Sequence, residues 1–173
     1  MLERTGLVTF GGKPVTLIGQ ELKIGDRAPD FELTGNDLQP VRLDDFRGKN
    51  LIILSLPSLD TPICDLETRR FNTEAEGLGD DVVILAVSMD LPFAQKRWCG
   101  AAGVSRVLTA SDYREASFGA AYGILIKEYR LLARAVFIVD RDGILRYQQL
   151  VAEAGREPDY GLVLAAIRSL KGG

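Results

Sequence analysis

Three stretches of this chain are apolar at nearly every position instead of alternating between apolar and polar residues. They are residues 50–57 (NLIILSLP), 81–89 (DVVILAVSM) and 134–140 (RAVFIVD). A strand whose sheet is covered on both faces buries every side chain, so these runs predict central strands. Helix-like segments lie between and after them, at residues 62–78, 92–101, 113–122 and from about Asp159 to Leu170.

Two groups of turn residues predict hairpins. Gly11 and Gly12 lie between the short apolar stretches of residues 7–18 (LVTFGGKPVTLI), which indicates an N-terminal hairpin. Residues 141–143 (RDG) join the third apolar run to residues 144–151, because Asp-Gly supplies the positive φ that a tight turn requires. The element order βαβαβα, followed by a hairpin and a helix, predicts an α/β fold with a central mixed sheet.

The length of 173 residues predicts one domain, because a folded chain of this size buries about 70% of the surface that it exposes when unfolded. We expect residues 1–173 to form that domain, with residues 1–20 as a hairpin extension. The apolar fraction of 46% and the charged fraction of 26% are globular values. The net charge of −3, without a basic cluster, argues against nucleic acid as a partner.

Neither a membrane span nor a signal peptide is expected. The longest apolar runs are far shorter than the roughly 18 residues that suggest a transmembrane helix. The start of the chain (MLERTGLVTF) lacks the apolar centre of a signal peptide, so the expected location is cytoplasmic. Reducing systems in the cytoplasm keep thiols reduced. A disulfide between two cysteines is therefore expected to be transient and catalytic there, not permanent.

The absence of histidine excludes several kinds of active site. A Ser-His-Asp triad, a Cys-His pair and the His-based zinc and iron sites all need imidazole. Two cysteines cannot complete a Cys₄ cluster, and no glycine motif for nucleotide binding is present. We therefore expect no metal and no cofactor, and any chemistry has to use the cysteines.

Cys64 has two interpretations. Pro62 suits the first position of the predicted helix and Thr61 its N-cap, which makes Cys64 the third helical residue; Asp60 as N-cap would shift this register by one. The backbone N–H groups and the helix dipole favour a thiolate there. Alternatively, Cys64 is a core residue of a largely apolar helix face that continues with Thr68, Phe71, Ala75 and Leu78. The pattern leaves both interpretations open.

A resemblance favours the first interpretation. The residues Pro57, Thr61 and Cys64 form the P-x-x-x-T-x-x-C motif of peroxiredoxins, and PSLDTPICDLETRRFN resembles its form in the bacterial thiol peroxidase branch. The segments DLPFAQKRWCG, LLARAVFIVD and EPDYGLVLAAI are similar to that branch in the same order, so the resemblance covers nearly the whole chain. It implies a thioredoxin-like fold, reduction of hydrogen peroxide and organic hydroperoxides, thioredoxin as the reductant, and a homodimer.

The resemblance also assigns roles to residues. Cys64 is the peroxidatic nucleophile, Thr61 hydrogen-bonds the sulfur or the peroxide, and Pro57 excludes solvent. The family's arginine corresponds to Arg134, whose charge would stabilise the thiolate and the departing oxygen. Composition could not have selected it, because three further arginines were equally eligible: Arg69, Arg70 and Arg97.

Cys99 is implied to be the resolving cysteine of an atypical two-cysteine mechanism within one subunit. It ends a short predicted helix and is followed by Gly100 and Gly103, where the backbone should open easily. We expect the two sulfurs to be apart in the reduced protein and to meet after local unwinding. The alternatives are an inert thiol and a permanent bridge to Cys64, which a domain of this size does not need.

Two other functions are weighed against peroxide reduction. A general dithiol oxidoreductase normally uses C-x-x-C, whereas Cys64 is followed by Asp65, Leu66 and Glu67. A thioredoxin-fold binding module without enzymatic activity would leave Cys64 inert. Peroxide-dependent oxidation of Cys64 discriminates between this module and the enzyme.

Overall fold

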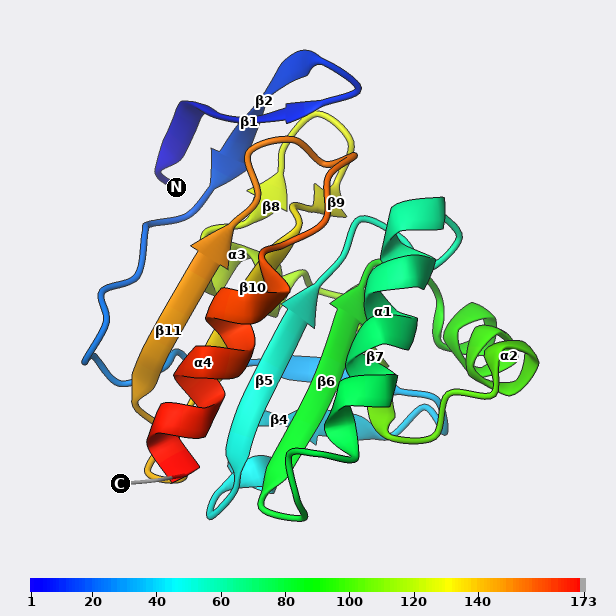
Figure 1. Ribbon diagram of the computed structural model, residues 1–173. Coiled ribbons are helices and arrows are strands. Elements are labelled where there is room, and N and C mark those ends of the chain that lie inside the picture. Colours follow the sequence, from blue (N-terminus) through cyan, green and yellow to red (C-terminus); the bar gives the residue numbers. More distant parts are fainter. Residues whose placement is uncertain (172–173) are drawn as a thin grey trace.

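The computed structural model describes residues 1–171, and within them the chain forms two β-sheets (Figure 1). The larger sheet has seven strands, in the order β11 (Leu145–Leu150), β10 (Ala135–Val139), β5 (Asn50–Ser55), β6 (Val82–Ser88), β7 (Val107–Ser111), β3 (Glu32–Gly35) and β4 (Pro40–Arg42). The smaller has four, in the order β1 (Glu3–Phe10), β2 (Lys13–Ile18), β8 (Leu125–Ile126) and β9 (Leu131–Leu132).

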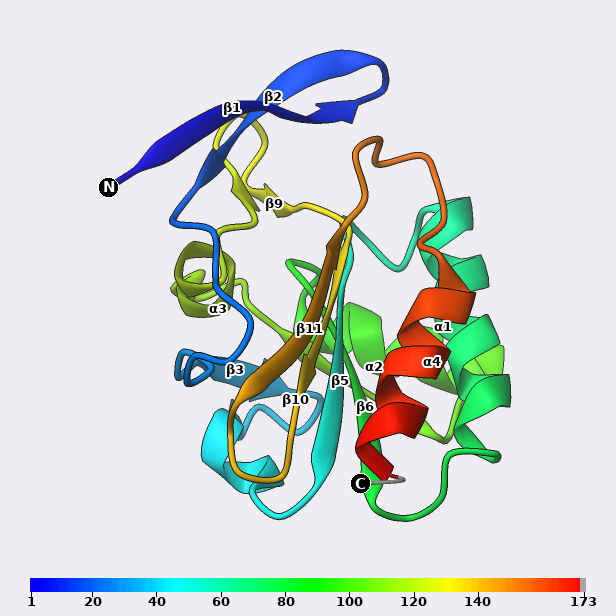
Figure 2. The same ribbon diagram turned by 60° about the vertical axis from the view of Figure 1, so that its left-hand side comes forward.

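The helices of the described residues are α1 (Pro62–Ala75), α2 (Pro92–Ala102), α3 (Ser117–Ala121) and α4 (Tyr160–Lys171), with a 3₁₀ helix at Leu43–Phe46. Helices α1 and α4 cover one face of the larger sheet, and α3 lies on the other side (Figure 2). No helix among residues 1–171 has the length and apolar character needed to cross a membrane.

The three apolar runs form central strands, as the sequence predicted. Strands β5, β6 and β7 are parallel, and β10 is antiparallel to β5, so the sheet is mixed as expected. Successive residues of β5 supply opposite cores: Leu51 and Ile53 belong to the cluster on the α3 side, Ile52 and Leu54 to the cluster under α1 and α4. Strong burial on both faces explains why these runs do not alternate.

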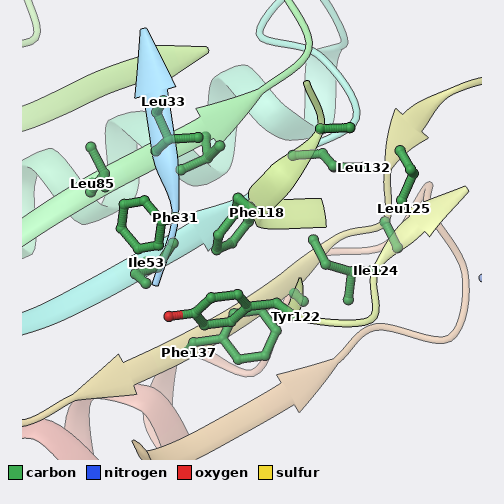
Figure 3. Close-up of a cluster of buried hydrophobic side chains, with 14 of the residues drawn as sticks. Phe31, Leu33, Ile53, Leu85, Phe118, Tyr122, Ile124, Leu125, Leu132 and Phe137 are labelled. Atoms are coloured by element: carbon green, nitrogen blue, oxygen red, sulfur yellow. The ribbon is translucent and has the colours of Figure 1, made fainter. Parts of the chain in front are cut away.

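The core on the α3 side is rich in aromatic rings (Figure 3). Phe118, Tyr122 and Phe137 pack with ring centroids 4.6 to 6.2 Å apart. The Tyr122 hydroxyl at its edge donates to the carbonyl of Pro29 at 2.8 Å. This packing ties α3 and the segment before β3 to the larger sheet.

Both predicted hairpins are confirmed. Strands β1 and β2 pair antiparallel around Gly11 and Gly12, whose φ angles are 60° and 79°. Strands β10 and β11 pair antiparallel across a turn in which Gly143 has a φ of 83°. The N-terminal hairpin lies over the end of the larger sheet at which β5 terminates (Figure 1), and this places it near the loop that leads to α1.

The predicted helix over residues 113–122 is too long. The helix α3 begins only at Ser117, because Ala116 adopts a left-handed conformation with a φ of 54° and Asp112 accepts hydrogen bonds from the N–H groups of Phe118 and Gly119. The pattern also gave no bounds for β7 and missed four short strands, β3, β4, β8 and β9. Each of these four has only two to four residues, too few for a periodicity to show.

Candidate functional site

The first turn of α1 presents Cys64 at a capped helix terminus. Thr61 has an extended backbone, and its Oγ1 accepts a hydrogen bond from the Cys64 N–H at 3.3 Å. Pro62 is the first helical residue, which the missing N–H of proline permits. Thr61 is therefore the N-cap, Asp60 is not, and Cys64 is the third residue of the helix as predicted.

The Cys64 side chain is completely buried. It belongs to the apolar cluster under α1 and α4 together with Phe71, Ala75 and Leu78, and the Thr68 hydroxyl donates to the Cys64 carbonyl at 2.8 Å. The apolar face predicted for this helix is thus confirmed. Cys64 is therefore both the third residue of a capped helix and a member of the apolar core.

Arg134 lies directly before β10 and is also buried, with 1% of its surface exposed. Its Nε and Nη2 donate to the carbonyl of Ala154 at 3.1 and 2.7 Å, and its Nη1 donates to Glu67 Oε1 at 3.1 Å. A guanidinium has five N–H groups, and among residues 1–171 these three bonds leave two N–H groups without a partner. By contrast, Arg69, Arg70 and Arg97 lie on the surface.

One cavity of about 220 Å³ brings several predicted site residues together. Pro57, Thr61 and Arg134 all line it, and the residues between Thr61 and Cys64, Pro62 and Ile63, line it as well. The remaining walls are the tip of the N-terminal hairpin (Phe10 and Gly11) and the loop of residues 153–155. Cys64 follows Ile63 directly in the sequence, is not part of the cavity lining and is fully buried.

The hairpin tip is fastened to that loop, which the sequence did not indicate. The Thr9 N–H donates to the carbonyl of Ala152 at 2.8 Å, and the Ala154 N–H donates to the carbonyl of Thr9 at 3.0 Å. The Glu153 carboxylate accepts from the Thr9 hydroxyl and from the N–H groups of Gly12 and Gly155. The bond from Thr9 is the main reason that the pKa of Glu153 is held below its usual range. The N-terminal hairpin is therefore part of the cavity wall.

Glu67 is a further residue of the site that was not predicted from the sequence. It is completely buried, and among the described residues its Oε2 has no hydrogen-bond partner. Burial raises the pKa of Glu67 from its ordinary 4.5 to about 7, although the Arg134 guanidinium pulls in the opposite direction. Helical periodicity could have found it, because Glu67 lies three residues after Cys64 and four before Phe71 on the same face.

Replacing Glu67 with glutamine is expected to flatten the pH dependence of stability. Between pH 4.5 and 7 the folded protein keeps a proton on Glu67 that the unfolded chain releases, so the free energy of unfolding falls as the pH rises. Glutamine does not titrate, so this decrease should be absent from the variant. In the wild type it should amount to at most about 3 kcal/mol of unfolding free energy over this pH range. Urea unfolding of both proteins from pH 5 to 8 measures it.

The matched control for this experiment is Glu74→Gln. Like Glu67, Glu74 lies on α1 and pairs with an arginine: its Oε1 is 3.1 Å from the Nε of Arg70. Unlike Glu67, its side chain is partly exposed. Parallel stability profiles for the wild type and Glu67→Gln across this pH range would contradict a raised pKa for Glu67.

Cys99 lies outside the cavity, on α2. Its Sγ is 3.4 Å from the Thr109 hydroxyl on β7, and that hydroxyl donates to Asn36 Oδ1 at 3.0 Å. Both thiols are free. Gly103 ends α2 in the left-handed conformation, with a φ of 66°, as expected for a glycine after a helix. The residues 1–171 contain no group of acidic or cysteine side chains that could hold a metal ion.

Comparison with known proteins identifies relatives over most of the chain. The profile of the Redoxin family matches residues 23–164. The thiol peroxidase of Halalkalibacterium halodurans is 51% identical over 162 residues, which cover 94% of this chain and 97% of the relative. The thiol peroxidase of Bacillus subtilis is 52% identical over 163 residues, with coverages of 94% and 97%.

Solved structures agree with this. A peroxiredoxin-like protein from Aquifex aeolicus superposes with a TM-score of 0.89 at 42% identity, covering 96% of this chain and 98% of that one. A thiol peroxidase from Chromobacterium violaceum has a TM-score of 0.85 at 21% identity, with coverages of 95% and 97%, and shares the fold. The expected thioredoxin-like fold is confirmed.

Proposed function

This chain belongs to the redoxin family and is a peroxiredoxin-type thiol peroxidase, and from that premise we propose that Cys64 reduces hydroperoxides and Cys99 resolves the oxidised form. The observation that carries the proposal is the cavity in which Pro57, Thr61 and buried Arg134 meet next to the first turn of α1. A peroxide that enters there lies beside Arg134 and next to the first turn of α1, which carries the buried Cys64.

In the first step the Cys64 thiolate attacks one peroxide oxygen. The sulfur–oxygen bond forms as the O–O bond breaks, Cys64 becomes a sulfenic acid, and the other oxygen leaves as water or an alcohol after taking a proton. Negative charge grows on the leaving oxygen, so fixed donors in a dry site speed the reaction. Arg134 lines the cavity and has two N–H groups without a partner among residues 1–171, which suits this role, and Thr61 borders the same cavity.

In the second step the Cys99 sulfur attacks the Cys64 sulfur. The S–S bond forms, the S–O bond of the sulfenic acid breaks, and the hydroxyl leaves as water with the Cys99 proton. Cys99 is the only other cysteine of the chain. The Cys99 Sγ contacts Thr109 on β7 and Cys64 is fully buried, so we expect at least one of the two segments to move before the sulfurs meet.

The remaining parts of the proposal concern the surroundings of the enzyme. Thioredoxin reduces the Cys64–Cys99 disulfide, the protein acts in the cytoplasm, and it works as a homodimer. The net charge of −3 gives no support to a nucleic-acid partner. Residues 1–173 act as one domain, with residues 1–20 as a hairpin extension that carries part of the cavity wall. The C-x-x-C spacing of a general dithiol oxidoreductase is absent from the chain.

The test is a coupled assay with thioredoxin, thioredoxin reductase and NADPH. Hydrogen peroxide and an organic hydroperoxide should each cause NADPH consumption that depends on the protein. Mass mapping without reductant should identify an intramolecular Cys64–Cys99 disulfide after one equivalent of peroxide. Crosslinks only between subunits, or an unmodified Cys64 after treatment, would exclude the proposed mechanism.

A further inference from the structure

Three side chains join the helices that carry the two cysteines, and the mechanism above does not use them. Asp65 on α1 follows Cys64 directly, and Trp98 on α2 directly precedes Cys99. The Trp98 indole N–H donates to Asp65 Oδ1 at 2.9 Å, and Arg69 Nε donates to Asp65 Oδ2 at 2.9 Å. We call Asp65, Arg69 and Trp98 the α1–α2 clasp; Figure 1 shows α2 beside α1.

Arg69 binds α2 at two further points. Its guanidinium carbon lies 5.9 Å from the centre of the Trp98 ring, within the range of a cation–π contact. Its Nη1 donates to the carbonyl of Ala102, the last residue of α2, at 3.2 Å. The last carbonyls of a helix lack partners within the helix and favour cations. Arg69 therefore stabilises the end of α2 in which Cys99 lies.

The clasp spans both segments that have to move for the disulfide to form. Neighbouring helical residues point about 100° apart, so Trp98 faces α1 while Cys99 faces Thr109 on β7. A disulfide needs the two Cα atoms within about 7 Å and a fixed geometry. When the first turn of α1 unwinds, Asp65 moves with Cys64; when α2 opens, Trp98 moves with Cys99. Either motion stretches the same hydrogen bond.

We propose that the α1–α2 clasp sets the rate at which the Cys64 sulfenic acid is converted to the Cys64–Cys99 disulfide. Asp65, Arg69 and Trp98 are then positioning residues, and the inference rests on the mechanism proposed above. Disulfide formation releases water, as described, and competes with a second peroxide that oxidises the sulfenic acid to sulfinic acid. A stronger clasp delays the disulfide and leaves more time for this overoxidation.

The chain offers a matched pair of variants. Arg69 pairs with Asp65 at i−4 and contacts Trp98 of α2, whereas Arg70 pairs with Glu74 at i+4 and stacks on Tyr160 of α4. Both side chains are 48% exposed. Arg69→Gln thus loosens α2, and Arg70→Gln removes similar contacts on the other side of α1. Trp98→Phe is the second test variant, because it keeps an aromatic ring and removes the N–H donor.

The experiment follows full-length wild-type protein and the three variants after mixing with hydrogen peroxide, with rapid quenching and mass analysis. Arg69→Gln and Trp98→Phe should form the disulfide roughly three- to tenfold faster, the effect expected for one lost bond to a charged group at a half-exposed site. They should also need proportionally more peroxide before sulfinic acid accumulates. The rate of the first oxidation should stay within about twofold of wild type, as should all rates of Arg70→Gln.

Tryptophan emission gives an independent readout. Trp98 is the only tryptophan of the chain, so its fluorescence in the wild type should change in the same kinetic phase as disulfide formation. A merely structural role for the clasp would lower the melting temperature of Arg69→Gln without moving the balance between disulfide and sulfinic acid.

Two outcomes overturn the proposal and are distinguishable. If the wild type forms the disulfide and Arg69→Gln forms it no faster, the clasp does not control this step while the two-cysteine mechanism stands. If the wild type forms no intramolecular disulfide, both the two-cysteine mechanism and the proposed role of the clasp are contradicted. Arg69→Gln alone decides the first outcome should Trp98→Phe fail to fold.

Discussion

Replacing Cys64 with serine is expected to abolish peroxide-dependent turnover. A hydroxyl is a far weaker nucleophile than a thiolate at neutral pH, so the rate should fall by on the order of 1,000-fold or more. NADPH consumption in the coupled thioredoxin assay measures the loss. Because Cys64 is completely buried, a thermal unfolding curve has to accompany it, to show that the serine hydroxyl has not unfolded the protein.

Cys99→Ser separates the two thiols in the same assay. It keeps Cys64 and the cavity, so its first oxidation, followed by stopped flow, should match that of the wild type. Without a resolving thiol it should turn over once and then accumulate sulfenic and sulfinic acid on Cys64. Sustained turnover by Cys64→Ser would remove Cys64 from the chemistry, and sustained turnover by Cys99→Ser would remove Cys99 from the resolving step.

Arg134→Lys should slow the oxidation of Cys64 by on the order of 100-fold. Lysine keeps the positive charge but loses the planar fork, which donates through Nε and Nη2 to Ala154 and through Nη1 to Glu67. The donors left for the peroxide would no longer have a fixed direction. Stopped-flow measurement of the second-order rate with hydrogen peroxide gives the result, and an unchanged rate would exclude Arg134 from the mechanism.

The double variant Arg134→Lys with Glu67→Gln distinguishes the contribution of Arg134 to stability from its contribution to the oxidation rate. At pH 8, above the pKa of about 7, Glu67 is ionised, and lysine at 134 does not reproduce the oriented bond from Arg134 Nη1, so stability should fall by up to about 3 kcal/mol. In Arg134→Lys with Glu67→Gln no buried carboxylate remains at this pH, so stability should recover in part. The oxidation rate should stay low, because no oriented guanidinium has been restored. Recovery of both would mean that Arg134 acts only through the folded structure.

The features of this fold that the sequence predicted are those encoded in neighbouring residues. The continuous apolar runs of β5, β6 and β10 directly indicate strands buried on both faces. The pairs Gly11-Gly12 and Asp142-Gly143 indicate the two hairpin turns. Strand β8 pairs with the distant strand β2 on one side and with β9 on the other, and within residues 1–171 β9 pairs only with β8. Each pairing involves two residues per strand, too few to leave a pattern in the sequence. In α3, the side chain of Asp112 and the conformation of Ala116 overrode helix propensity.

The candidate site divides in the same way. Thr61, Pro62 and Cys64 are adjacent, and helix capping alone was enough to place them. Arg134 could be chosen only through family resemblance, because one charge beside an apolar strand does not reveal that its side chain is buried. Glu67 could be read from helical periodicity. Nothing local links Thr9 with Glu153, which are 144 positions apart and meet through a few contacts.

The attachment of the N-terminal hairpin has a consequence for synthesis of the protein. Thr9 leaves the ribosome early, yet the residue with which its backbone pairs, Ala152, follows 143 positions later. At elongation rates of roughly 5 to 20 residues per second, this interval lasts about 7 to 30 s. Contacts between such distant positions also form late when a chain folds. Cys64 is therefore synthesised well before the hairpin can close the cavity wall, and the complete site forms only after residues 152–154 have been added.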